Sequence, residues 1–204
     1  MKIQMTSLEE KVMKLYLEMG IETPSSINMN DIANYLDIWI HLYDGESQVF
    51  KRRGLYSMFL NRSLTPEERW QDFGHEIGHV IKHVGDQHKL RIAFRELQEF
   101  QANNFMYHFC VPSFMLLDYE ISNFMNIEDG VPFILEKFPV TEEFAKRRLL
   151  MLSNQMQLSN SDYLIRQKIN SGQQKKSENW SPETKTILRK LYRQLEKSKE
   201  GVTA

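Results

Sequence analysis

The sequence predicts an α+β fold, in which one small antiparallel sheet of about three strands lies between helical segments. Short runs of β-type residues fall between residues 38 and 61, whereas the segments on either side carry apolar residues at helical spacing. The 204 residues are 41% hydrophobic and 26% charged, which is enough for one sizeable domain with its own core and an extension.

Two helices are expected ahead of the sheet. The first begins after a capping residue, Thr6 or Ser7, and ends at Gly20. The second is short and covers residues 31–36, after a break at Pro24.

The sheet is expected to begin as a hairpin. Residues 38–43 form its first strand, Asp44-Gly45 supplies the turn, and residues 48–51 return antiparallel to the first strand. Residues 54–61 form a third strand. If that strand lies at an exposed edge, an extended substrate can add to it as a further strand; otherwise it is an ordinary half-buried strand.

The segment after the sheet is a strongly predicted helix. Thr65 caps it, Pro66 occupies its first turn and Gly85 ends it. Its core-facing stripe consists of Trp70, Phe73, Ile77, Val80, Ile81 and Val84. A second helix covers residues 91–109 and ends before Pro112.

The C-terminal half is expected to be helical and then polar. Helical pieces are predicted at residues 113–124, 132–138 and 141–150. The Ser-, Asn-, Gln- and Lys-rich residues 153–179 are expected to form a linker or weakly ordered chain. Ser181 and Pro182 begin a final amphipathic helix, whose apolar face consists of Leu188, Leu191, Tyr192 and Leu195. That face is expected to serve either self-association or docking onto the chain's own domain.

Three regions follow from this pattern. Residues 1–112 form the core, residues 113–152 form a helical segment packed on it, and residues 153–204 form the polar linker and terminal helix. From residue 151 onward there are ten Lys or Arg against five Asp or Glu, so this tail is about +5 in a chain of net charge −1. Because acids alternate with these bases, we interpret them as a solvated helix face and expect no direct nucleic-acid binding.

Composition places the chain in a soluble, cytoplasmic class. No run approaches the roughly 20 apolar residues of a membrane span, and the first residues lack the pattern of a secretory leader. The lone cysteine, Cys110, cannot close an internal disulfide, which agrees with a reducing compartment. We therefore expect no membrane partner.

The sequence His75-Glu76-Ile77-Gly78-His79 predicts a metal site. The two histidines stand one helical turn apart on one face, so both imidazoles reach a single ion, and the glutamate lies beside it. Two neutral imidazoles with one oxygen ligand and an open fourth position are typical of catalytic zinc, one ion per chain. Glu76 would then activate zinc-bound water as the general base.

The third ligand is expected on the following helix. Lys82 and Gly85 stand where a metzincin pattern requires glycine and histidine, which excludes that class. Glu96 and Glu99 are the carboxylate candidates. Glu99 shares its stripe with apolar residues, and a carboxylate on an apolar stripe is costly unless it is paired or bound to metal, so we choose Glu99. The alternative is that Glu99 is a surface residue at a helix edge.

Other polar side chains near the motif have no assigned role. His83 is two turns from His75, about 12 Å along the helix, which is too far to share one ion with both other histidines. His88 is interpreted as a solvated loop residue. The oxyanion-stabilising residue stays open among four candidates, Tyr56, Arg95, Tyr107 and His108.

These motifs resemble the ImmA/IrrE metallopeptidases of bacteria and their mobile elements. The matching stretches are Arg69 to His83, Glu99 to Phe105 and Val111-Pro112, with weaker matches at Phe138 to Thr141 and at Arg148-Leu149. The resemblance covers roughly residues 7–150. Met106-Tyr107-His108 departs from it, because the family usually has small residues there, and the tail lies outside it.

The resemblance implies a zincin-like metallopeptidase core, with zinc held by His75, His79 and Glu99 and with Glu76 as catalytic base. It also implies a regulatory protease, a hydrolase that cleaves or inactivates a helix-turn-helix repressor of a phage-like element. The alternative class is an antirepressor or DNA-binding module whose metal is structural or absent. A zinc hydrolase acting on a non-protein amide ranks third.

Overall fold

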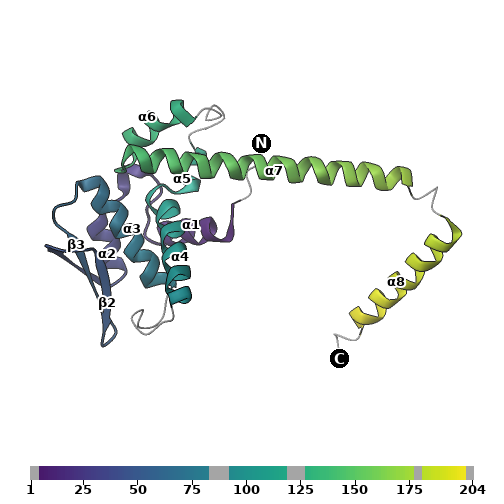
Figure 1. Ribbon diagram of the computed structural model, residues 1–204, viewed down its shortest axis with the longest axis horizontal. Coiled ribbons are helices and arrows are strands. Elements are labelled where there is room, and N and C mark those ends of the chain that lie inside the picture. Colours follow the sequence, from purple (N-terminus) through teal and green to yellow (C-terminus); the bar gives the residue numbers. More distant parts are fainter. Residues whose placement is uncertain (1–4, 83–91, 119–126, 177–180, 201–204) are drawn as a thin grey trace. The chain divides into compact units, whose positions relative to one another are not determined.

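A computed structural model describes residues 5–82, 92–118, 127–176 and 181–200 of the chain (Figure 1). His83, Gly85, His88 and the predicted helix end at residues 119–124 lie outside these ranges. The chain divides into two compact units, residues 1–156 and residues 157–204, which are described separately below. Within the described ranges, the α+β class is confirmed.

The first unit begins with two capped helices. Helix α1 (Ser7–Glu18) starts with a complete capping box between Thr6 and Glu9. A short 3₁₀ turn, η1 (Pro24–Ser26), leads to α2 (Met29–Tyr35), which begins at the side chain of Asn28.

The sheet is mixed, so the antiparallel prediction is wrong. Its strands are β1 (Ile38–Tyr43), β2 (Gln48–Arg52) and β3 (Leu55–Asn61), in the order β1-β3-β2. Strand β3 pairs parallel with β1 and antiparallel with β2.

The hairpin joins β2 to β3, whereas the sequence predicted a hairpin between β1 and β2. Asp44-Gly45 only links β1 to β2, which are not neighbours in the sheet. The tight turn is Arg53-Gly54, between β2 and β3, with φ of 52° and 89°. A pair of left-handed residues suits a two-residue hairpin. Arginine seldom adopts that conformation, so the turn could not be recognised from the sequence.

The third strand is not an edge strand, so the alternative in which a substrate adds to it as a further strand does not apply. Strand β3 is paired on both sides, and the free edges belong to β1 and β2. Met58 and Leu60 of β3 are fully buried in the core. The half-buried alternative for residues 54–61 therefore describes the strand better.

Helices α3 (Pro66–Lys82) and α4 (Ile92–Cys110) lie side by side (Figure 1). Two glycines allow this close approach. A methyl group placed on Gly78 would lie 3.0 Å from the Cα of Ala102, and one on Gly74 would lie 2.6 Å from Cys110 Sγ. The backbones of the two helices can approach because neither glycine carries a side chain.

Aromatic rings join these helices to α1. Phe109 of α4 packs against Tyr16, Trp70, Phe73 and Phe105, with ring centroids 5.2–6.2 Å apart. The hydroxyl of Tyr16 donates to the carbonyl oxygen of Phe109 at 2.9 Å, so the one polar atom of this buried ring is satisfied.

Three further helices follow: α5 (Ser113–Asp118), α6 (Ile127–Lys137) and α7 (Glu142–Lys176). The start of α7 contributes Phe144, Ala145 and Leu149 to the core. Arg148 is also completely buried there, and its guanidinium donates to Val111 O at 3.0 Å and to Ser113 Oγ at 2.5 Å.

Arg148 belongs to a buried polar network centred on Glu9. The Glu9 carboxylate accepts hydrogen bonds from Ser113 Oγ and, at 2.7 Å, from Gln155 Nε2. His108 Nδ1 and an Arg148 nitrogen lie 3.6 Å and 4.0 Å from it. Hydrogen bonds hold the pKa of Glu9 below its ordinary value despite burial, so the carboxylate stays charged and links α1, α5 and α7.

The polar linker predicted for residues 153–179 is a helix through Lys176. Helix α7 continues from the first unit into the second, where Leu158, Tyr163, Leu164, Ile165 and Ile169 are about half exposed or more. The polar composition of this stretch led to the prediction of a linker. Only Gly172 in it opposes helix formation strongly. Helix α8 (Pro182–Glu200) begins as predicted, with Ser181 Oγ accepting from Thr184 N at 3.2 Å.

Candidate metal centre

Side chains of α3 and α4 form a three-ligand cluster. His75 and His79 stand one turn apart on α3, and Glu99 faces them from α4. One ligand atom from each of the three lies within 4.8 Å of the others, the only such cluster found among the described residues. The close crossing at Gly78 brings Glu99 to the histidines, since a larger residue there would hold α4 away.

The spacing of the ligand atoms fits a tetrahedral zinc ion. Nε2 of His79 lies 3.0 Å from Nε2 of His75, and the Glu99 oxygens lie 3.3 Å from His75 Nε2 and 3.6 Å from His79 Nε2. Zinc ligands at about 2.0–2.2 Å in a tetrahedron are separated by about 3.3–3.6 Å, which both distances to Glu99 match, while the two histidine nitrogens lie slightly closer together. The nitrogen, nitrogen and oxygen donors also match the ligand types of catalytic zinc sites.

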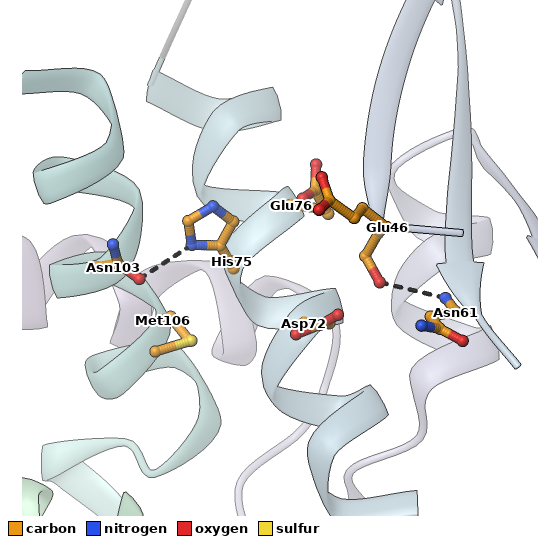
Figure 2. A pocket seen from close by; sticks show the side chains of 8 residues that line it. Glu46, Asn61, Asp72, His75, Glu76, Asn103 and Met106 are labelled. Carbon is orange, nitrogen blue, oxygen red and sulfur yellow. Dashed lines mark hydrogen bonds between the residues drawn. The ribbon is translucent and has the colours of Figure 1, made fainter. Parts of the chain in front are cut away.

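Asn103 orients one of the histidines. Its Oδ1 lies 3.2 Å from Nδ1 of His75 and accepts a hydrogen bond when the proton is on Nδ1 (Figure 2). That tautomer leaves Nε2 of His75, the nitrogen nearest Glu99, with a lone pair for a metal. Asn103 stands one turn after Glu99, so a single face of α4 supplies both residues.

Glu76 is buried beside the cluster and holds its proton tightly. It is only 6% exposed, and burial, with the negative charges of Asp72 and Glu99, raises its pKa from 4.5 to about 8. A hydrogen bond from the backbone N–H of Val49 in β2 opposes this rise. The metal-free carboxyl is therefore largely protonated at neutral pH.

A pocket of about 420 Å³ adjoins the cluster on the Glu76 side (Figure 2). Its walls come from α3, from α4 and from the strand ends of the sheet. The lining residues are Glu46, Ser47, Asn61, Asp72, His75, Glu76, Asn103 and Met106. On the other side, the Glu99 side chain is 43% exposed, so the ligand cluster is reached from solvent. A substrate thus has both an approach and a recess beside Glu76.

The remaining candidates lie elsewhere. Glu96 is exposed and is not part of the ligand cluster. None of the four candidate oxyanion stabilisers lines the pocket. Tyr107 packs on Phe144, and His108 lies near Glu9. Tyr56 accepts from Lys51 Nζ, and Arg95 is exposed.

Sequence reasoning missed three residues of this site, namely Asn103, Asp72 and Glu46. Spacing alone offered a signal for two of them, because Asn103 is four residues after Glu99 and Asp72 is four residues before Glu76. No sequence spacing relates Glu46 to the motif residues. It lies in the connection between β1 and β2, and its place in the pocket depends on the order of the strands.

The fold and the cluster are those of a metallopeptidase-type domain. The model of the IrrE N-terminal-like domain family matches residues 33–150, which is more than half of the chain. The chain therefore belongs to this peptidase family.

Two proteins of Bacillus subtilis (strain 168) are similar to the chain. The phage-like element PBSX protein XkdA is 49% identical over 147 residues, which are 72% of this chain and 73% of XkdA. The uncharacterized protein YqaB is 31% identical over 149 residues, which are 73% of this chain and 86% of YqaB. Among the described residues, no helix has the length and apolar character needed to span a membrane.

Proposed function

We propose that the chain is a zinc-dependent endopeptidase that hydrolyses a protein substrate. The observation that carries this proposal is the three-ligand cluster with a buried glutamate beside it, at the mouth of a pocket. His75, His79 and Glu99 would hold the zinc ion. When bound there, zinc supplies Lewis-acid chemistry, making a water molecule acidic near neutral pH and polarising the carbonyl group of a peptide bond.

Glu76 has the position and the environment of a general base. Its carboxylate would take a proton from the attacking water and later deliver it to the nitrogen of the leaving amine. Such a group must be ionised before it takes the proton and must then hold the proton until it is delivered. Burial favours the protonated form of Glu76, and the positive charge of a bound zinc ion would favour the ionised form. Val49 N–H fixes the carboxyl in place. Asn103 would keep His75 in the tautomer that binds metal through Nε2.

The substrate that we propose is a helix-turn-helix repressor of a phage-like element, and the role is regulatory. The similarity to a protein of such an element supports this choice. The soluble, cytoplasmic location proposed from the composition agrees with a repressor as substrate.

A DNA-binding module ranks second. A recognition helix needs a free polar face, whereas residues 141–150 of α7 give Phe144, Ala145, Arg148 and Leu149 to the interior. Residues 141–150 therefore pack into the core. The candidate metal site explains the function better than DNA binding does.

The first test is metal content. Mass spectrometry of protein purified without an affinity tag should give about one zinc per chain in wild type. His79→Ala and Glu99→Ala should each lose the metal. Glu96→Ala is the matched control, because it removes an exposed carboxylate of the same helix outside the cluster, and it should retain zinc. A wild-type chain that binds no zinc, even when zinc is added, would contradict the proposal.

Catalysis needs a separate test. A helix-turn-helix repressor of a phage-like element is incubated with zinc-loaded wild type and with Glu76→Gln, and the products are read by mass spectrometry. Wild type should cut at one site, and the variant should bind zinc but lose at least about a hundredfold in rate, the size of a general-base contribution. Equal cleavage by both proteins would remove Glu76 from the mechanism.

A further inference from the structure

The pocket beside Glu76 carries an excess of negative charge. Glu46, Asp72 and Glu76 line it, and among the described residues no lysine or arginine does. Because Glu76 holds a proton in the metal-free chain, Glu46 and Asp72 carry this charge. Figure 2 shows Glu76 and Asp72 on α3, with Asp72 one turn below Glu76, and Glu46 on the side of the sheet. The other lining residues are neutral or, for His75, belong to the ligand cluster.

Among the described residues, Arg62 and Arg69 do not neutralise this charge. Arg62 pairs with Asp44 at 3.1 Å and donates to Leu42 O. Arg69 donates to the carbonyl oxygens of Arg62 and Leu64. Both guanidinium groups are thus committed to groups outside the pocket lining.

Asp72 is available to a ligand. Within the described residues it makes no hydrogen bond and no ion pair, although its side chain is only partly exposed. A charge held in this way favours an incoming cation.

The size and the walls of the pocket suit one long side chain. A volume of about 420 Å³ lies within the ordinary range of ligand pockets. Met106 offers an apolar wall for a methylene stem, while the amides of Asn61 and Asn103 offer hydrogen-bonding groups. A second metal ion is a poorer occupant, since no three ligand atoms of the pocket cluster as those of His75, His79 and Glu99 do among the described residues.

We propose that this pocket receives an arginine or lysine side chain of the protein substrate, next to the peptide bond that is cut, and that Asp72 is the residue that selects it. This inference rests on the proposed function for its place in the reaction. The binding preference itself is a property of the pocket and can be measured without catalysis.

The test uses the full chain loaded with zinc and carrying Glu76→Gln, which prevents hydrolysis. Binding of capped tetrapeptides is measured by calorimetry, with arginine or its neutral isostere citrulline at one position after another. At one position, arginine should bind about tenfold more tightly than citrulline, or about 1.4 kcal/mol. Adding Asp72→Asn should bring that ratio close to one, while Asp72→Glu should preserve it.

The matched control is Asp31→Asn, which makes the same chemical change at an exposed residue of α2 outside the pocket lining and should leave the ratio unchanged. If Asp72→Asn fails to fold, Glu46→Gln tests the same charge from the other wall, and it should lower the ratio. Equal binding of both peptides at every position, a preference that survives Asp72→Asn, or no saturable binding would each overturn the inference.

Cleavage distinguishes this inference from the proposed function. An arginine preference that depends on Asp72, in a chain whose wild type cuts no repressor, would refute the peptidase proposal alone. Cleavage at sites without a neighbouring basic residue, unaffected by Asp72→Asn, would refute the specificity proposal alone.

Discussion

Two buried carboxyl groups of the first unit differ in how their surroundings stabilise a negative charge. Glu9 and Glu76 are both buried carboxyl groups, yet the pKa of Glu9 is lowered and that of Glu76 is raised. Glu9 accepts several hydrogen bonds, whereas Glu76 faces two other carboxylates and accepts one backbone hydrogen bond. The Glu9 charge holds the fold together, and the protonated Glu76 suits the proton transfer that we propose for it.

The raised pKa of Glu76 makes the metal-free protein less stable as the pH rises. The folded chain holds the Glu76 proton up to about pH 8, whereas the unfolded chain releases it near 4.5. The stabilising contribution is therefore complete below pH 4.5 and is lost progressively as the pH rises through 8.

Urea unfolding in the presence of a chelator measures this effect. The free energy of unfolding of wild type should fall between about pH 5 and about pH 8 relative to that of Glu76→Gln, which has no such proton. The variant retains every histidine, so their titration largely cancels in the difference. Parallel pH profiles for the two proteins would show that Glu76 has an ordinary pKa.

At the scale of elements, the site depends on the crossing of α3 and α4. Gly78→Ala would place a methyl group 3.0 Å from the Cα of Ala102 and 3.2 Å from its carbonyl oxygen. Alanine favours a helix over glycine by about 1 kcal/mol, so propensity alone predicts a more stable protein. We expect the reverse, a lower melting temperature and weaker zinc binding, because the crowded methyl group separates Glu99 from the histidines.

Calorimetric melting and zinc titration check this expectation. Gly172→Ala is the matched control, since Gly172 lies in α7 beyond the first unit, and it should not lower the melting temperature. A stabilised Gly78→Ala protein with unchanged zinc affinity would show that the two helices can move apart without consequence.

The helices that carry the candidate site could be predicted because their signals are local. Caps, helical periodicity and one-turn spacing placed His75, Glu76 and His79 on a single face, and the same periodicity chose Glu99 over Glu96. The sheet order could not be predicted in this way. A parallel pairing of β1 with β3 depends on contacts distant in sequence, and the true hairpin turn uses Arg53, an unusual residue for positive φ. The pocket was missed for the same reason, because Glu46 reaches it only through that strand order.

At the scale of the whole molecule, the two units differ in the functional groups that they contain. The ligand cluster, the pocket and the Glu9 network all belong to residues 1–156. In the second unit, Leu158 of α7 and Ile187 of α8 are more than half exposed. The first unit therefore contains the proposed zinc ligands, the proposed general base and the pocket.

A chain that ends after Met156 should fold and bind zinc as the full chain does. Gln155, the last residue with a recorded bond to the network, is retained. Melting temperature and zinc stoichiometry are the measurements, and both should match those of the full chain. A second truncation after Ser153 is the informative comparison, since it removes the Gln155 hydrogen bond and should lower the melting temperature. Loss of folding in the longer fragment would mean that the second unit supports the first.

The Glu9 network also affects how the chain matures on the ribosome. Glu9 leaves the ribosome early, but its partner Gln155 is 146 residues further along the chain. At roughly 5–20 residues per second, synthesis separates the two by roughly 7–30 s. During that interval the carboxylate must stay hydrated, because burial without Arg148 and Gln155 would leave an unpaired charge in the interior. We therefore expect helix α1 to take its final place, and the core to close, only when nearly the whole first unit has emerged.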